Sequence, residues 1–169
     1  MLENIRFAVI ITSDRAADGR REDATAPLLK AAIEQAGGHC KETAVIPDDP
    51  DRLREELSRL ADNAAVDVIL TSGGTGIGPR DITVDVIRAL LEKELPGFGE
   101  EMRRRSLEKT PYAILSRATA GTLRGKLVIN LPGSPRGAVE CLEWVMKPLA
   151  HAVRLLQQLD TDCAPPSGS

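Results

Sequence analysis

Short apolar runs alternate along this chain with stretches in which apolar residues recur every three or four positions. The first pattern is typical of buried strands, and the second is typical of amphipathic helices. Strand-like runs fall at 5–12, 39–46, 66–70, 113–118 and 126–130. Helical spacing follows the first three runs, at 27–36, 53–60 and from near Thr83, and returns at 100–109. A last helical region contains Pro148, which is predicted to break or kink it ahead of a closing helix from Leu149 to Leu159.

Turn-forming residues divide these elements. Asp49 stands directly before Pro50, which predicts a helix with an aspartate N-cap and proline in its first turn. The Pro-Gly-Phe-Gly stretch at 96–99 predicts a break between two helices. Gly121 and Gly125 bracket a predicted turn, so the two last strand-like runs are expected to form a hairpin-like excursion.

The alternation of strand and helix predicts an α/β fold, a three-layer α/β/α sandwich with a mostly parallel sheet. A chain of 169 residues is long enough for one domain with a sizeable core. We expect that domain to span residues 1–159. The Pro/Ser/Gly-rich residues 160–169 are expected to form a disordered C-terminal tail.

Composition narrows the classes of function. The net charge is −3 and aromatic residues make up 2% of the chain, which argues against a nucleic-acid-binding surface or base-stacking platforms. No apolar run reaches the roughly 18 residues of a membrane span, and the N-terminus lacks a signal-peptide pattern, so a cytoplasmic location is expected. Cys40, Cys141 and Cys163 are scattered and fit neither a disulfide framework nor a zinc site.

The stretch from Thr71 to Thr83 carries the strongest chemical signal, because four glycines fall within six residues where a strand passes into a helix. Glycines let backbone N–H groups converge on an anion, and open α/β sheets bind ligands at this edge. Asp81 suits a divalent cation that accompanies a phosphate. Two plainer interpretations remain: the glycines simply make a tight turn, and Asp81 caps the following helix. The spacing matches neither of the common nucleotide-binding glycine motifs.

Other polar clusters follow the predicted strands at the same edge. They are Ser13-Asp14-Arg15, which precedes an expected mobile loop at 16–24, then Pro47-Asp48-Asp49, and the residues 130–135. Convergence of separate strand ends favours a site there. The run Arg103-Arg104-Arg105 is either a solvated helix face or an attraction for an anionic substrate.

Several of these stretches, taken in order, resemble the motifs of the molybdopterin adenylyltransferases, the Mog/MoaB-like family. The resemblance covers roughly residues 5–158. The matching stretches are Ser13–Ala16, Pro47-Asp48, Thr71–Gly76 with Pro79-Arg80-Asp81, Pro96–Glu100, Leu115–Ala118 and Asn130–Pro135.

The resemblance implies a molybdopterin-binding fold and a homotrimer that joins molybdopterin to AMP from MgATP and releases pyrophosphate. Mg²⁺ would be the cofactor and ATP the co-substrate. The adenylylated pterin would then pass to a downstream metal-insertion enzyme, with which a transient contact is expected. The attacking phosphate is already ionised at neutral pH, so this chemistry needs positioning and charge neutralisation rather than a histidine base.

The resemblance also implies roles for individual residues. Asp48 and Asp81 match the family's essential acidic positions and would hold Mg²⁺. Substrate and nucleotide binding is implied for Ser13, Asp14, Gly73, Gly74, Thr75, Gly76, Ser116, Asn130, Pro132, Gly133 and Ser134.

The sequence departs from the family pattern at two places. Thr83-Val84-Asp85 stands where Thr-Pro-Glu is usual, and Thr25-Ala26-Pro27 stands where Ser-Gly-Pro is usual. A small local effect is expected from the first, since an acidic residue is kept near the helix start. A non-catalytic molybdopterin-binding or scaffold protein of the same fold is the alternative, which Asp48 and Asp81 argue against and which pyrophosphate release would test.

Overall fold

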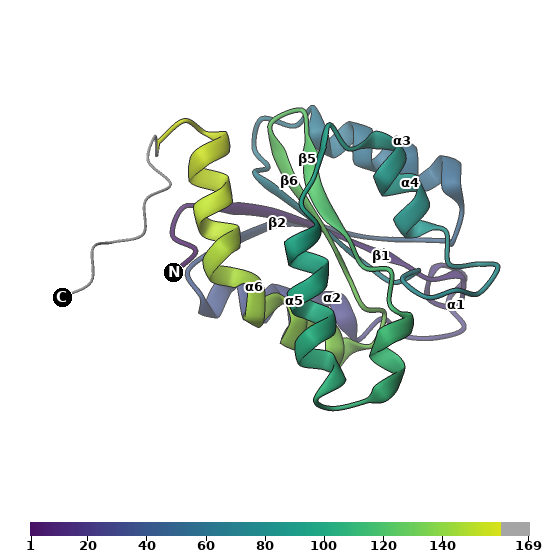
Figure 1. The fold of residues 1–169 in the computed structure, drawn as a ribbon. Helices are drawn as coiled ribbons and strands as arrows, with labels where there is room; N and C mark the ends of the chain where they lie inside the picture. The colour runs from purple at the N-terminus through teal and green to yellow at the C-terminus, as the bar shows by residue number, and fades with distance from the viewer. Residues whose placement is uncertain (160–169) are drawn as a thin grey trace.

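The computed structural model describes residues 1–159; the tail expected at 160–169 lies outside the described residues. Strands and helices alternate through most of the chain (Figure 1). The elements are β1 (Arg6–Thr12), α1 (Asp14–Ala17), α2 (Thr25–Gln35), β2 (His39–Ile46), α3 (Pro50–Ala61), β3 (Val68–Ser72), α4 (Thr83–Leu90), β4 (Lys93–Glu94), α5 (Pro96–Leu107), the 3₁₀ helix η1 (Pro111–Leu115), β5 (Ala120–Leu123), β6 (Lys126–Leu131) and α6 (Pro135–Leu156).

One sheet contains all six strands in the order β2-β1-β3-β6-β5-β4. The first four strands are parallel, and helices lie in the chain between β1 and β2, between β2 and β3, and between β3 and β6. β5 and β4 add an antiparallel edge. Ile10, Thr71 and Asn130 lie side by side in register near the ends of β1, β3 and β6. The loops that follow these strands therefore emerge along one edge of the sheet.

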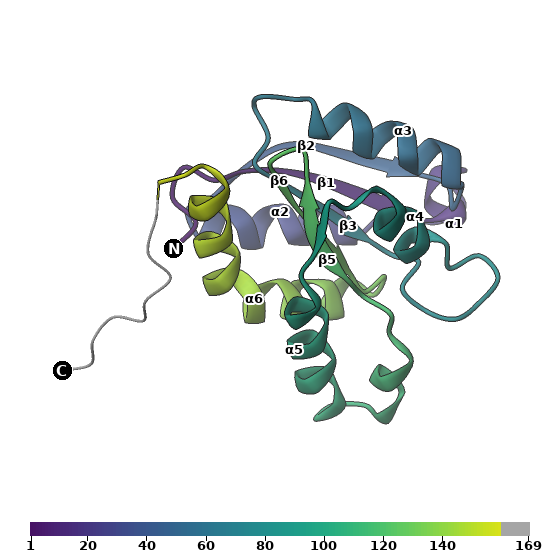
Figure 2. The same cartoon turned by 45° about the horizontal axis from the view of Figure 1, so that its top comes forward.

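Helices cover both faces of the sheet, which confirms the predicted three-layer sandwich with a mostly parallel sheet. α2, α5 and α6 lie on one face, and α3 and α4 lie on the other (Figure 2). Phe7 and Leu29 are fully buried between the sheet and the first group of helices. Leu53 and Ile69 are fully buried between the sheet and the second group. Within residues 1–159, no helix has the length and apolar character needed to cross a membrane.

Several local predictions are confirmed. β2 occupies the predicted residues 39–46, and α4 begins at Thr83. Asp49 caps α3, since its carboxylate accepts hydrogen bonds from the backbone N–H groups of Asp51 and Arg52 at 3.0 and 2.9 Å. Capping and strand periodicity depend on neighbours a few residues away, so both could be predicted from the sequence.

The strand predicted at 113–118 is wrong. Its first half lies in η1, where Pro111 stands in the first turn and the Thr110 hydroxyl accepts from the N–H of Tyr112 at 3.4 Å. Residues 116–118 are in neither a helix nor a strand. The strand that pairs with β6 is β5, and the turn between them is at Arg124 and Gly125, both with positive φ. Such a two-residue turn suits an antiparallel hairpin. The predicted hairpin is therefore present, with a different first strand.

Three other boundaries also differ from the prediction. Pro96 stands in the first turn of α5, so the 96–99 stretch begins a helix instead of separating two. α6 runs through Pro148 as one helix, so the closing helix is its second half. Residues 14–17 form the single turn α1, capped by the Ser13 hydroxyl, which accepts from the N–H of Ala16 at 3.3 Å.

Candidate active site

The glycine loop after β3 has a backbone that only glycine suits at two positions. Gly73 and Gly74 have φ values of +112° and +60°. A Cβ on Gly73 would collide with the backbone carbonyl of Thr12 and lie 2.6 Å from the Thr12 hydroxyl. A Cβ on Gly74 would collide with the Thr83 side chain, whose Cβ is 2.8 Å away. These glycines let the loop pass between the end of β1 and the start of α4.

A second loop, which follows β6, packs against the glycine loop. The Ser72 hydroxyl donates to the carbonyl of Pro132 at 2.7 Å, and the N–H of Gly73 donates to the carbonyl of Leu131 at 3.2 Å. A Cβ on Gly133 would lie 3.3 Å from the Cα of Gly73. The two loops are thus in backbone contact, and together they form one wall at the carboxyl edge of the sheet.

Asn130 lies beneath this wall. Its side chain is fully buried, and its Nδ2 donates to the Thr71 hydroxyl at 2.9 Å and to the Gly73 carbonyl at 3.2 Å. Its Oδ1 is buried and accepts no hydrogen bond from the described residues. Asn130 therefore supports the glycine loop from inside the protein, and its predicted contact with a ligand stays a prediction.

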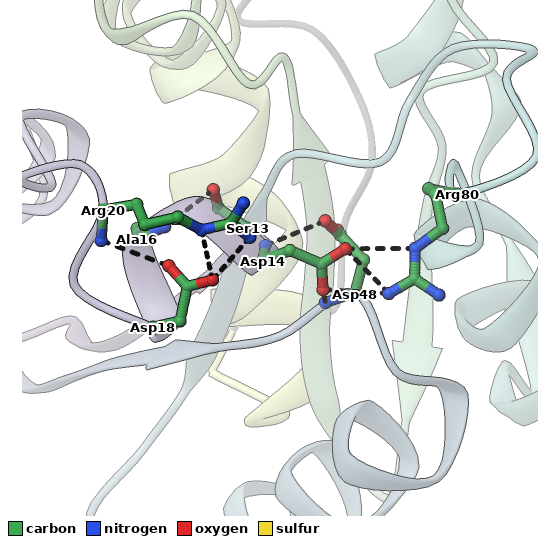
Figure 3. Close-up of polar contacts among 7 residues, drawn as sticks. All are labelled: Ser13, Asp14, Ala16, Asp18, Arg20, Asp48 and Arg80. Atoms are coloured by element: carbon green, nitrogen blue, oxygen red, sulfur yellow. Dashed lines mark hydrogen bonds and ion pairs between the residues drawn. The ribbon is translucent and has the colours of Figure 1, made fainter.

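Asp14 and Asp48 are held together although they are far apart in the sequence. The N–H of Asp48 donates to Asp14 Oδ1 at 3.0 Å, and the N–H of Asp14 donates to Asp48 Oδ2 at 3.1 Å. Arg80 donates to both carboxylate oxygens of Asp14 at 2.8–3.1 Å, so Asp14 lies between Asp48 and Arg80 (Figure 3). The N–H of Asp48, followed by the guanidinium of Arg80, lowers the pKa of Asp14 below its ordinary value.

The pKa of Asp48 is shifted in the opposite direction, above its ordinary value. Partial burial raises the pKa of its carboxyl group, and the negative charges of Asp14 and Asp81 add to the rise. The N–H of Asp14 and the charge of Arg80 oppose the shift without cancelling it. The carboxylate of Asp48 is thus only partly compensated by the protein's own donors and cations, and a bound cation would favour its charged form.

Asp81 folds back into its own loop. Its Oδ2 accepts from the N–H of Gly78 at 2.8 Å and lies 2.7 Å from the point where a Cβ on Gly76 would stand. α4 has Ile82 as its N-cap and gains no side-chain capping bond from any described residue. The alternative that Asp81 caps the helix is therefore wrong.

Most predicted binding residues line two pockets. A pocket of about 230 Å³ contains both predicted metal ligands and part of the glycine loop: Ser13, Asp48, Gly73, Gly74, Asp81 and Gly133. A larger pocket of about 690 Å³ contains Thr75, Ser116, Pro132 and Ser134. Within residues 1–159, Gly76 and Asn130 line neither pocket, and Asp14 lies in a shallow depression beside Arg80.

Two cations of the larger pocket, Lys109 and Arg136, were not predicted from the sequence, whereas Arg103 belongs to the arginine run for which attraction of an anionic substrate was one alternative. Arg103, Lys109 and Arg136 line this pocket together with Tyr112. Of the arginine run on α5, Arg103 faces the pocket, whereas Arg104 pairs with Glu101 at 2.8 Å on the surface. Arg136 comes directly after the predicted binding loop at 130–135. Its position in the sequence could therefore have identified it as a candidate pocket residue.

The residues present fit a magnesium ion held jointly with a ligand. Among the described residues, no cluster of three or more potential metal-binding side chains is found. Asp48 and Asp81 line the same pocket, and each has one carboxylate oxygen without a hydrogen bond from the described residues. Magnesium commonly takes only one or two protein carboxylates and completes its shell with water and phosphate oxygens.

A glycine loop at the carboxyl edge of a mostly parallel sheet, with Asp48 and Asp81 in the pocket beside it, defines the class: an α/β protein with a candidate ligand site at that edge. A family model described as "Probable molybdopterin binding domain" matches residues 8–152. The chain therefore belongs to this molybdopterin-binding family, and the family predicted from the motifs is confirmed.

Individual relatives belong to the same family of molybdenum cofactor proteins. The molybdopterin adenylyltransferase of Helicobacter pylori strain J99 is 36% identical over 157 residues, which cover 92% of this chain and 89% of the relative. The molybdenum cofactor synthesis protein cinnamon of Drosophila melanogaster is 36% identical over 156 residues, which cover 92% of this chain but only 26% of that longer protein. The crystal structure of the molybdopterin biosynthesis enzyme MoaB from Thermus thermophilus has a TM-score of 0.85 and 40% identity, and the match covers 91% of this chain and 97% of that one.

Proposed function

We propose that this chain is a molybdopterin adenylyltransferase of molybdenum cofactor biosynthesis, which transfers AMP from ATP to molybdopterin and releases pyrophosphate. The names of its relatives agree with the function predicted from the motifs. The observation that carries the proposal is the meeting of Asp48, Asp81 and the glycines Gly73 and Gly74 in one pocket. That pocket combines backbone turns suited to phosphates with carboxylates suited to a cation.

The two pockets suggest how the substrates are divided. The smaller pocket takes the reacting phosphates, because it holds the glycine loop and both carboxylates. The larger pocket, lined by Arg103, Lys109 and Arg136, takes the bulky ring system at the far end of a substrate. Neighbouring residues of each loop, such as Gly74 and Thr75, line different pockets. Phosphoryl chemistry therefore takes place at the boundary that the two loops share.

Each group has a role that its surroundings support. The terminal phosphate of molybdopterin is the nucleophile, so the protein supplies alignment and charge neutralisation rather than a general base. Asp48 and Asp81 would hold Mg²⁺, which when bound neutralises phosphate charge and stabilises the departing pyrophosphate. Backbone N–H groups of the glycine loop donate to phosphate oxygens, and Asn130 keeps that loop in place by its bond to Gly73.

The test is incubation of the purified chain with molybdopterin and MgATP, followed by measurement of adenylylated product and pyrophosphate. We expect both products to form in equal amounts, and both to disappear when EDTA removes the divalent cation. Binding of molybdopterin without release of pyrophosphate would instead identify a non-catalytic binding protein of the same fold. The homotrimer, the cytoplasmic location and the transient contact with a metal-insertion enzyme belong to the same proposal and are supported by the family resemblance.

A further inference from the structure

One side chain outside both pockets holds the two ends of the exposed part of the glycine loop. Arg117 Nε donates to the carbonyl of Gly76 at 2.8 Å, and its Nη2 donates to the carbonyl of Asp81 at 2.6 Å. Its Nη1 contacts both carboxylate oxygens of Asp85 at 2.8 and 3.1 Å. All three guanidinium nitrogens are therefore used, two on backbone carbonyls and one on a carboxylate.

The backbone beside Arg117 connects the same loop to the larger pocket. The N–H of Arg117 donates to the carbonyl of Thr75 at 2.8 Å. Thr75 and Ser116, the neighbour of Arg117, both line the larger pocket. Asp81, at the other end of the held segment, lines the smaller pocket. The contacts of Arg117 therefore connect a wall of one pocket to the backbone of Asp81, which lines the other.

The segment between these anchors has few other contacts. Ile77, near its tip, has 70% of its surface exposed. The remaining backbone N–H bonds are local: Gly78 N–H to the Asp81 carboxylate, Asp81 N–H to the Gly78 carbonyl, and Ile82 N–H to the Arg80 carbonyl. Beyond the segment, the Arg80 side chain, which is 65% exposed, donates to the Asp14 carboxylate at 2.8–3.1 Å. Closing a short glycine-rich segment costs conformational entropy, so one guanidinium that binds both ends has a large effect on how long Asp81 stays in place.

We propose that Arg117 is a positioning residue that closes the glycine loop and holds Asp81 at a fixed distance from the larger pocket. The proposal rests on the proposed adenylyl transfer, because it is for that reaction that Asp81 must be placed. A planar guanidinium is required, since two carbonyls and a carboxylate in different directions need its fork of donors. The ion pair with Asp85 contributes less, because the Asp85 side chain is 64% exposed.

The test compares Arg117→Gln and Arg117→Lys with Asp85→Asn and with the control Arg124→Gln. Arg124 makes a similar bidentate contact with Asp62, with both distances at 2.8 Å, at the opposite edge of the sheet. Amide hydrogen exchange is measured at Gly78, Asp81 and Ile82, whose N–H groups are bonded within the loop. The kcat and KM for MgATP and the melting temperature are measured on the same proteins.

We expect both Arg117 variants to exchange these three amides about 10-fold faster or more. Their kcat should fall by about 10- to 100-fold, while KM changes by less than about 3-fold, because misplacement of Asp81 affects the transition state most. The lysine variant should resemble the glutamine variant, since an ammonium group cannot bridge both carbonyls. Asp85→Asn and Arg124→Gln should leave the exchange rates and kcat within about twofold of the wild type.

Three results would overturn the proposal: wild-type exchange in Arg117→Gln, full recovery in Arg117→Lys, or an equal loss of kcat in Arg124→Gln. The exchange measurement needs no catalysis. If the wild-type chain formed no adenylylated product, the proposed function would fail, and exchange at the three amides would still decide whether Arg117 closes the loop.

Discussion

Two carboxylates at opposite edges of the same sheet have opposite surroundings. Asp67, just before β3, accepts from the backbone N–H, Nε and Nη2 of Arg6 at 2.7–2.9 Å and from Gln157 at 3.0 Å. Asp48, just after β2, accepts one hydrogen bond from the described residues, from the N–H of Asp14 at 3.1 Å. Burial by itself would raise the pKa of Asp67, but the hydrogen bonds from Arg6 outweigh it and lower that pKa. At Asp48, burial prevails and raises the pKa.

The difference separates a structural carboxylate from one suited to a ligand. Asp67 is 7% exposed and has hydrogen bonds on both oxygens, so its charge is matched inside the protein. Asp48 retains an oxygen without a partner among the described residues and has Asp14 and Asp81 nearby. A buried carboxylate with hydrogen bonds on both oxygens, such as Asp67, stabilises the fold. A carboxylate with a free oxygen and other negative charges nearby, such as Asp48, is stabilised by a bound cation. Changes at the two edges should therefore affect different properties.

The largest effect is expected from Asp81→Asn. Asparagine keeps an oxygen that can accept from the Gly78 N–H, but it brings no charge to a metal ion. Adenylyl transfer should fall by at least about 100-fold, extra Mg²⁺ should restore it only partly, and molybdopterin should still bind. The melting temperature should stay within a few degrees of the wild type. Rates are measured at limiting and saturating Mg²⁺.

The matched control is Asp49→Asn, next to Asp48. Asp49 caps α3, and asparagine caps a helix about as well as aspartate. This variant should keep both its rate and its stability. Transfer at the wild-type rate by Asp81→Asn at limiting Mg²⁺ would show that the metal assignment is wrong.

Next in size is Asp67→Ala, which should affect stability alone. Removing the carboxylate leaves Arg6 without its partner and should lower the free energy of unfolding by about 2–4 kcal/mol. The melting temperature should fall by about 5–15 °C. The rate per folded molecule should not change, because Asp67 lies at the edge remote from the pockets. A loss of transfer without a loss of stability would contradict the comparison.

Acid should affect the structural carboxylate in a defined direction. The folded-state pKa of Asp67 is lowered, so its stabilising effect is fully present above the unfolded value of about 3.9 and is lost as the pH falls through the folded value. The wild type should therefore lose more stability between about pH 5 and pH 2 than Asp67→Asn does. Urea unfolding across this range measures the difference. Parallel pH curves for the two proteins would show that Asp67 has an ordinary pKa.

The smallest effect is expected from Arg80→Gln, which removes the partner of Asp14. The Arg80 side chain is 65% exposed, so its ion pair contributes little to stability, and the melting temperature should change by no more than about 2 °C. Arg6→Gln, at the other edge, should cost clearly more, because its partner Asp67 is buried. Both melting temperatures are measured by thermal unfolding. Equal decreases for the two variants would show that the ion pairs at the two edges contribute equally to stability.

Much of the fold could be predicted because its signals are local. The apolar runs of β1 and β6, the Asp49 cap and the helix at Thr83 depend on residues a few positions apart. The prediction failed at 113–118, where an apolar run forms the exposed helix η1 and leaves Ile114 70% exposed. An apolar run indicates burial only where the tertiary structure brings another layer against it.

The candidate site was predicted as a set of loops but not as a set of contacts. The glycine loop, Asp48 and Asp81 could be identified from residue types at strand ends, and they line one pocket. The bonds of Asp14 to Asp48 and to Arg80 join residues 34 and 66 positions apart, and no spacing in the sequence indicates them. Arg117 lay inside a matching motif, yet its bonds to Gly76 and Asp81 emerge only in the folded chain.

The sequence by itself determined most of the alternation of strands and helices, the edge at which the loops gather and the glycines that the loop backbone needs. Periodicity, capping and positive φ depend on residues a few positions apart, so they can be predicted from the sequence. The tertiary structure alone decided that Asp67 has hydrogen bonds on both carboxylate oxygens and that Asp48 lines a pocket. It also placed Asn130 beneath the loop. Those outcomes depend on strand register and loop packing, which bring together groups that are distant in the chain.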